Sequence, residues 1–499
     1  MIPRGGYKVQ IRSFDLGGIN TYSNPLIPAV NDYTAIAGLT QINTGIQQDG
    51  ILIRAVNVDS YPLGGKQKRP GYTTFLDTSD GSAPVKLFNW VKNNGTSSYL
   101  YRASGTLLQY YDVGAGTGTT WQICGNGTIG AGSIMSHAVL ANTLIVSDGG
   151  TTRHSIDGTS FTDTPLAPPM VSMDQFQNRI YGAGTDSTLF YSVANDPTNW
   201  NLSGTSDSSS IIIPDSGRLN KVIKLNNALT IAKTSTKMFI WDGYNLLDLS
   251  TELGPTAPQS ATKVEDHGFW LNRLGFFTST GAANQLISNP VQRQIYNDAG
   301  LGIAGTTFDN APSVVHRYDY MTSVGSVQDD LTNNGINNCV MKYNYQKNEW
   351  LNYSFASQPT SFVSYKDNTG VQRLIFGDST GQCYTYGGTA TSDNNNPIEA
   401  TMEILFHFNY PYVDKEFRWL WLFFNPGCQA KVQVAMTDTF IKGAKKWLDV
   451  GDVSSGIKQF RFPTGSKGKL LFLRITESSK NARFDYYGCA IDANLNPQN

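Results

Sequence analysis

Short apolar runs, each flanked by Gly, Asn or Asp, recur along the middle of the chain. Within them apolar residues either alternate with polar ones or stand side by side over a few positions, which is typical of β-strands. The clearest runs are LLQYYD from Leu107, LIVSDG from Leu144, IYGAG from Ile180, LFYSV from Leu189, LTIAK from Leu229, KMFIWDG from Lys237, FWLNRLGFFTS from Phe269, CVMKYNY from Cys339 and RLIFGDSTGQCYTY from Arg373. The pattern predicts many short strands joined by tight turns.

Aromatic residues reveal a repeat among these runs. Trp121, Phe161 and Trp200 each close a group of runs, and they lie 40 and 39 residues apart. A period near 40 with several strands per period is typical of β-propeller blades, small sheets that bury their faces only by stacking on one another. A large irregular β-sandwich is the alternative fold.

The repeat indicates about seven units between Pro84 and Gly388. A longer gap between Pro290 and Asn337 leaves six or eight units open. The run VKLFNW from Val85 is the candidate for the strand that closes the ring with the last blade.

One turn has a recognisable form. HSIDGTSFTD, from His154, resembles a degenerate Asp-box. We expect Asp157 to accept backbone hydrogen bonds there and Gly158 to take a positive φ, so the predicted role of this motif is structural.

The pattern changes after the polar stretch TSDNNNP, from Thr391. Beyond it, KEFRWLWLFF from Lys415 puts aromatic and aliphatic residues on both faces of a strand, so both faces should be covered. Val432, Val434 and Met436 alternate with polar residues, as in a half-exposed strand. Further alternating runs separated by Gly and Ser turns predict a β-sandwich.

The expected fold is therefore all-β. Residues 1–80, rich in Pro, Gly and Asn, are interpreted as an N-terminal arm or docking segment that wraps a partner or another part of the chain. Residues 81–392 are predicted to form a β-propeller of about seven blades, and residues 393–499 a β-sandwich.

Composition agrees with this fold and limits the function. Charged residues make up 15% of the 499 residues, against about 25% in ordinary soluble domains. Seven of the 39 acidic residues are Glu, a strong helix former. The net charge of −1 predicts no general affinity for DNA or for anionic membranes.

Cysteine spacing and the N-terminus indicate the compartment. The five cysteines are scattered without a CxxC pair, so reduced, mostly buried thiols are expected. The opening MIPRGGYKVQIRSF lacks the apolar core of a signal peptide, and no run approaches the ~18 apolar residues of a membrane span. Synthesis in the cytoplasm is expected.

The segment from Phe14 to Phe75 carries the most specific motifs in the chain. It contains FDLGGIN, SNPLIP and then IRAVNVDSYPLGGKQKRPGYTTF. Arg69-Pro70-Gly71-Tyr72 is predicted to form a type II turn with Gly71 at positive φ, while Asn57 and Asp59 should bond to nearby backbone.

These phrases resemble the opening of tailed-bacteriophage tail hub and nozzle proteins of short-tailed phages, the group that includes packaged-DNA stabilisation proteins. Three later stretches resemble the same group, in the same order: NRIYGAGTDSTLFYSVANDPTNWN from Asn178, LTIAKTSTKMFIWDG from Leu229 and KEFRWLWLFF from Lys415. The resemblance is patchy but touches all three predicted regions.

The resemblance implies a structural virion protein of the tail, made in the host cytoplasm. It implies a homo-oligomeric ring of about six copies that extends the DNA channel below a portal or adaptor. Such a ring retains packaged DNA, which passes without sequence-specific binding, and anchors fibre, spike or needle proteins. The motifs name no catalytic residue.

Enzymatic chemistry has little support in the sequence. A propeller glycoside hydrolase needs paired carboxylates, and Asp329-Asp330, the only Asp-Asp dipeptide, is interpreted as a solvated loop. GNGTIG, from Gly125, has the letters of a dinucleotide motif but no following helix. The histidines show no ligand spacing: His137, His154, His267, His316 and His407. We predict no enzyme, with no catalytic, cofactor-binding or metal-binding residue. A receptor- or glycan-binding tail protein remains the main alternative.

Overall fold

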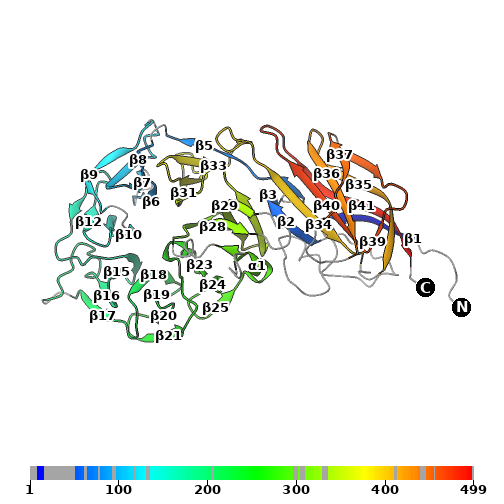
Figure 1. Ribbon diagram of the computed structural model, residues 1–499. Coiled ribbons are helices and arrows are strands. Elements are labelled where there is room, and N and C mark those ends of the chain that lie inside the picture. Colours follow the sequence, from blue (N-terminus) through cyan, green and yellow to red (C-terminus); the bar gives the residue numbers. More distant parts are fainter. Residues whose placement is uncertain are drawn as a thin grey trace.

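The described part of the chain folds mostly into antiparallel β-sheets (Figure 1). The structure, a computed structural model, describes residues 8–15, 51–60, 65–76, 79–92, 97–116, 118–130, 135–203, 207–295, 302–303, 310–328, 335–408, 413–438, 445–454 and 456–496. Helix in these ranges is limited to α1 (Gln292–Ile295) and two 3-10 turns, η2 (Pro258–Ser260) and η3 (Asn289–Val291).

Four-stranded sheets follow one another around a ring and form a β-propeller, as the repeat predicted (Figure 1). The first two are β6 (Pro84–Val91), β7 (Ser98–Ser104), β8 (Leu107–Asp112), β9 (Gln122–Thr128), and β10 (Ser136–Leu140), β11 (Thr143–Ser147), β12 (Thr152–Ser155), β13 (Thr162–Asp163). The next two are β14 (Ser172–Phe176), β15 (Arg179–Ala183), β16 (Thr188–Tyr191), β17 (Ser209–Ile212), and β18 (Leu219–Leu225), β19 (Ala228–Lys233), β20 (Met238–Trp241), β21 (Leu246–Ser250).

The ring continues with β22 (Thr262–Val264), β23 (His267–Asn272), β24 (Gly275–Ser279) and β25 (Asn284–Leu286). Then come β27 (Ser313–His316), β28 (Asp319–Gln328), β29 (Gly335–Asn344) and β30 (Glu349–Ser354), with β26 (Gly302–Ile303) beside β28. The last sheet joins β31 (Ser361–Lys366), β32 (Gln372–Gly377) and β33 (Cys383–Tyr386) to β5 (Tyr72–Phe75).

The first strands of successive sheets contact one another around the axis. These contacts join β10 to β14, β14 to β18, β18 to β22, β22 to β27, β27 to β31 and β31 to β6. Serine hydroxyls connect two of the steps: Ser136 Oγ accepts from Met173 N at 2.8 Å, and Ser172 Oγ accepts from Val222 N at 3.0 Å. Sheets that cannot bury their faces alone are thereby held side by side.

The three evenly spaced aromatic residues occupy matching places. Trp121 and Phe161 directly precede β9 and β13, and Trp200 lies between β16 and β17. All three are buried. The period of about 40 residues therefore reflects one repeated position before the outermost strand.

Ring closure differs from the prediction. VKLFNW forms most of β6, the first strand of its own sheet, and does not complete the last one. Instead β5, which precedes it in sequence, pairs antiparallel with β33, with Tyr72 opposite Tyr386 and Phe75 opposite Cys383. The short run YTTF has no distinctive hydrophobic period, so the sequence pattern gave no sign of this long-range pairing.

The remaining strands form two sheets beside the propeller (Figure 1). One continues from β30 through β2 (Ile51–Val56), β34 (Ala400–Phe406), β40 (Leu470–Glu477), β36 (Ala430–Thr437) and β37 (Leu448–Val453). The other contains β1 (Lys8–Asp15), β3 (Val58–Ser60), β4 (Lys66–Lys68), β35 (Asp414–Phe424), β38 (Ile457–Arg461), β39 (Lys467–Gly468) and β41 (Asp485–Asn496).

These two sheets share one hydrophobic core. Leu420 and Leu422 of β35 belong to the same buried cluster as Val432 of β36 and Leu473 of β40. The opposite face of β35 is less covered than predicted, because Trp419, Trp421 and Phe423 are only half-buried.

Residues 1–7, 16–50, 61–64 and 77–78 of the proposed N-terminal segment lie outside the described residues, and with them the phrases GGIN and SNPLIP. The described parts pair with the chain itself. β1 pairs with β41, β2 with β34, and the β3–β4 hairpin also with β41.

Candidate functional site

The Asp-box-like turn folds as the sequence predicted. Asp157 accepts backbone hydrogen bonds from Thr159 and Ser160, both at 2.8 Å, and Gly158 has a φ of 97°. The hydroxyl of Tyr101, on the neighbouring sheet, donates to the carbonyl of Gly158 at 2.8 Å. The motif therefore shapes a hairpin and joins two sheets.

Arg69, in the stretch KRPGY from Lys68, is fully buried where the propeller meets the two adjoining sheets. Its guanidinium donates to both carboxylate oxygens of Asp393, at 2.8 and 2.6 Å, and through Nε to Asn57 Oδ1 at 2.7 Å. The same group lies 4.6 Å from the ring centroid of Phe355. A bidentate ion pair of this kind fixes geometry as well as charge.

Gly71 is needed for a reason other than the one predicted. Its φ is not positive, so the expected type II turn is wrong. A Cβ on Gly71 would lie 2.0 Å from the backbone oxygen of Ser392. Close approach of two chain segments, and not turn geometry, excludes a side chain here.

Further buried ion pairs stabilise the same region, where the propeller meets the two adjoining sheets. Lys66 of β4 pairs with Glu349 of β30 at 2.6 Å, and Lys68 pairs with Glu477 at the end of β40. We call this set the junction cluster: Arg69–Asp393, Lys66–Glu349 and Lys68–Glu477. Its residues come from segments far apart in sequence, so it fixes how those segments pack together.

Asp59 bonds to nearby backbone, as predicted, whereas the backbone groups that bond to the side chain of Asn57 are distant in sequence. Asn57 donates to the carbonyl of Glu399 at 2.7 Å and accepts from the N–H of Ser354 at 2.8 Å. Asp59 accepts from the N–H of Ser60 at 3.0 Å. The motif therefore has a structural role.

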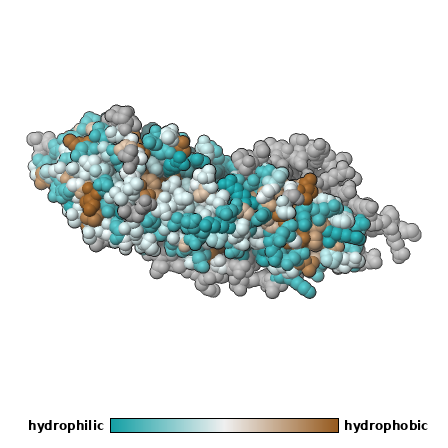
Figure 2. Space-filling model, turned by 90° about the horizontal axis from the view of Figure 1, so that it is seen from above, coloured by the Kyte–Doolittle hydropathy of each residue, from teal (hydrophilic) through white to brown (hydrophobic). Residues whose placement is uncertain are grey.

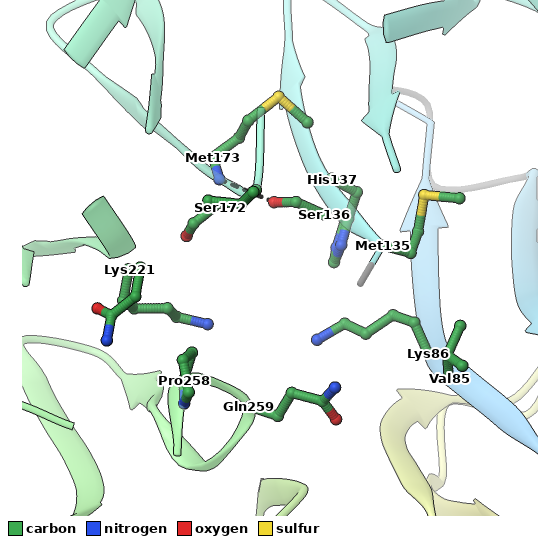
Figure 3. Close-up of a pocket in the computed structure, with 12 residues that line it drawn as sticks. Val85, Lys86, Met135, Ser136, His137, Ser172, Met173, Lys221, Pro258 and Gln259 are labelled. Carbon is green, nitrogen blue, oxygen red and sulfur yellow. Dashed lines mark hydrogen bonds between the residues drawn. The ribbon is translucent and has the colours of Figure 1, made fainter. Parts of the chain in front are cut away.

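A small cavity lies at the centre of the ring (Figure 3). It measures about 100 Å³ and is lined by the first strands of four successive sheets and by η2. Lys86 comes from β6, His137 from β10, Lys221 from β18 and Gln259 from η2. None of its described lining residues is Asp or Glu.

The cavity is electrostatically positive. Burial lowers the pKa of Lys86, and burial together with the charge of Lys86 lowers the pKa of Lys221 to about 7. Burial and the same lysines lower the pKa of His137 to about 3. His137 is therefore neutral at pH 7 and stacks on Phe88, with ring centroids 4.3 Å apart.

The sequence did not single out Lys86, His137 or Lys221. Each lies on a strand of a different sheet, and only the ring brings the three together. The one feature of the sequence that these residues share is their position, since all three lie on the first strand of a repeat unit.

The other predicted groups do not assemble into a reactive site. His154 contacts the hydroxyl of Thr164, His316 contacts that of Ser364, and Asp329-Asp330 lies outside the described residues. All five cysteine side chains are buried, as expected. Within the described ranges, no group of three or more His, Cys, Asp or Glu side chains is placed to hold a metal ion.

No helix in the described residues is both long and apolar enough to cross a membrane. No family model matches the chain, and no curated protein matches its sequence.

Solved structures resemble it only distantly. The WD40 β-propeller domain of Doa1 is 11% identical with a TM-score of 0.37, covering 64% of this chain and 97% of that one. YCF48 from Cyanidioschyzon merolae is 10% identical with a TM-score of 0.40, covering 63% and 98%. BBS1N, solved in complex with ARL6DN, is 10% identical with a TM-score of 0.41, covering 65% and 99%. At this distance none of them indicates a function for this chain.

Proposed function

We propose that the protein is a structural component of a tailed bacteriophage particle. In this role it forms a tail hub or nozzle ring that extends the DNA channel below the portal or adaptor, retains packaged DNA and anchors fibres, spikes or needles. The observation that carries the proposal is the resemblance of four stretches, in order, to such proteins. The most specific of them, from Phe14 to Phe75, ends in KRPGYTTF, which supplies Lys68 and Arg69 of the junction cluster and the ring-closing strand β5.

The architecture we propose has seven blades, a C-terminal β-sandwich and an N-terminal docking segment. Sheet order supports seven blades, counting β27 to β30 as one and β31 to β33 with β5 as another. The core shared by β35, β36 and β40 supports the sandwich. The proposed boundaries remain 1–80, 81–392 and 393–499.

We propose that the protein is not an enzyme. A glycoside hydrolase needs two carboxyl groups facing one substrate. The described lining of the central cavity instead offers two lysines and a histidine. Several carboxylates are used elsewhere, in tight turns such as that of Asp157 and in the junction cluster.

The outermost strands of the propeller offer a surface for ring assembly. We call it the rim: Ile123 of β9, Ile212 of β17 and Leu247 of β21, which are 61%, 78% and 58% exposed. The face seen in Figure 2 has small, separate hydrophobic patches on a mostly hydrophilic surface. In a closed ring, lateral contacts between copies would bury such exposed apolar side chains.

The near-neutral net charge of the protein is consistent with a channel through which DNA passes. With a net charge of −1, the protein would make few of the phosphate contacts that cause tight, salt-dependent DNA binding. We therefore expect genomic DNA to pass without sequence-specific binding. The protein would be made in the host cytoplasm and reside in the tail of the virion.

Mass spectrometry of DNA-filled particles, banded on a density gradient from the source culture, tests the proposal. The expected result is this chain at about six copies per particle, as closed cyclic symmetry suggests. Its absence from the particles, with the protein free in the lysate, would contradict a role in the virion.

A glycan- or receptor-binding tail protein is the alternative. Tyr244, in the turn between β20 and β21, is 87% exposed, and such a ring can stack on a sugar. A glycan array separates the two proposals, because specific binding that is lost in Tyr244→Ala supports the receptor role. The absence of specific glycan binding on the array favours the tail hub role.

A further inference from the structure

We propose that the central cavity of the propeller is a binding site for a small phosphate-class oxyanion, held between Lys86 and Lys221. This inference is independent of the proposed tail function. It rests on the geometry and charge of the cavity.

The two lysines reach the cavity from different blades. Lys86 extends from β6 and Lys221 from β18, and their ammonium groups point toward one another across the open space (Figure 3). The side-chain amide of Gln259 and the ring of His137 border the same space. An anion between the lysines would meet charged donors on two sides and neutral donors on the others.

The lysine charges are not balanced by nearby acids. Neither Lys86 nor Lys221 forms an ion pair with an acidic side chain in the described part of the chain. Asp174, the acidic residue that acts electrostatically on Lys221, instead binds Lys263 and accepts from the backbone N–H of Lys224 at 2.8 Å. Two like charges facing one cavity disfavour each other, and an anion would relieve that repulsion.

The chemistry of the walls supports this reading. Burial and the charge of Lys86 hold the pKa of Lys221 near 7, as expected for an ammonium group short of a counter-charge. His137 stays neutral at pH 7 and can donate one ring N–H. The cavity therefore offers a positive but weakly solvated setting in which charge-assisted hydrogen bonds are strong.

The size of the cavity limits the ligand. At about 100 Å³ it is smaller than the roughly 300–1,000 Å³ of sites for drug-sized molecules. It has room for one small oxyanion but not for a nucleotide. Two flanking cations favour a multiply charged tetrahedral ion over a monocarboxylate.

Titration of the full chain with inorganic phosphate, followed by calorimetry at constant ionic strength in chloride, tests the site. We expect saturable binding of one phosphate per chain, with acetate binding at least about tenfold more weakly. Lys86→Met and Lys221→Met should each weaken phosphate binding by about tenfold or more, since each removes a hydrogen bond from a charged group. Lys366→Gln, which changes an exposed lysine on β31, is the matched control and should bind as the wild type does.

Unfolding temperatures distinguish a ligand site from a structural role. Without phosphate, Lys86→Met should raise the unfolding temperature, because it removes one of two facing charges, and phosphate should stabilise only the wild type and the control. The proposal is overturned by wild-type phosphate affinity in both lysine variants, by equal affinity for acetate, by the absence of saturable binding, or by a lower unfolding temperature for Lys86→Met.

Discussion

At the scale of single residues, several aspartates build turns. Of the 39 acidic residues seven are Glu, which leaves 32 Asp. Asp157, Asp242, Asp367 and Asp378 each accept hydrogen bonds from backbone N–H groups two or more residues further along. The short Asp side chain reaches such groups, whereas Glu is too long, and this explains the unequal composition.

Asp367 should make stability depend on pH. Hydrogen bonds from Thr369 and Arg373 lower its pKa from 3.8 to about 2. Because the folded-state pKa is depressed, its stabilising contribution is complete above about pH 4 and disappears as the pH falls toward 2. The unfolding temperature of Asp367→Asn should lie below that of the wild type at pH 6, and the difference should shrink between pH 4 and pH 2. A difference independent of pH would contradict this role.

The junction cluster should contribute far more to stability than exposed ion pairs do. Asp393→Asn leaves the buried charge of Arg69 without a full counter-charge, so a loss of about 3–5 kcal/mol in the free energy of unfolding is expected. Asp163→Asn breaks the pair with Arg153, where Asp163 is 67% exposed, and should cost less than about 1 kcal/mol. Denaturant unfolding of the two variants measures the contrast, and equal losses would refute it.

Sequence reasoning succeeded for residues whose role is local. Asp157 and Gly158 were predicted because an Asp-box turn lies within a few residues. Gly71 was misassigned because the group that excludes its side chain belongs to Ser392, more than three hundred positions away. Lys86 and Lys221 were missed for the same reason, since only ring closure makes them neighbours.

At the scale of elements, strands were easier to predict than their pairing. The apolar runs and the period near 40 gave the propeller, because both depend on residues close in sequence. The position of β5 in the last sheet could not be predicted from the sequence, because Tyr72–Phe75 pairs with the distant strand Cys383–Tyr386. Pairing between strands so far apart in sequence does not change the local pattern of hydrophobic and polar residues.

Phe75 should hold the ring closed. Its ring lies 5.4 Å from that of Tyr111 and 6.0 Å from that of Trp121, so it joins the last sheet to the first. In Phe75→Ala, backbone amides of both β33 and β9 should exchange hydrogen faster. Tyr191→Ala, which removes a contact with Tyr181 elsewhere in the ring, is the control and should leave exchange in β33 and β9 unchanged. Faster exchange confined to β33 would show that Phe75 does not join the two sheets.

At the scale of the whole molecule, one of the two adjoining sheets continues directly from the propeller, because β2 pairs with β30. The junction cluster adds buried charge pairs to the same place. Together, the continuous sheet and the buried ion pairs should make the propeller and the adjoining sheets move as one. The stretch from Thr391, where the sequence pattern changes, is strongly polar, yet Asp393 within it is a buried member of the junction cluster.

The rim should matter for assembly and not for folding. Ile212→Asp combined with Leu247→Asp should leave the unfolding temperature nearly unchanged, because exposed substitutions alter stability by about 0.5 kcal/mol or less. The same variant should assemble poorly, which mass photometry of the purified protein would detect. Ile457→Asp, at a 67% exposed position on β38, is the control and should assemble normally. Normal rings from the rim variant would exclude this surface as the contact.

The central claim, a role in the tail, is tested most directly by cryo-electron microscopy of intact, DNA-filled particles from the source culture. The account predicts a closed ring of this fold on the tail axis below the portal, with the rim of each copy against its neighbour. Particles whose axial density cannot accommodate the propeller, or that carry it only at fibre tips, would contradict the claim.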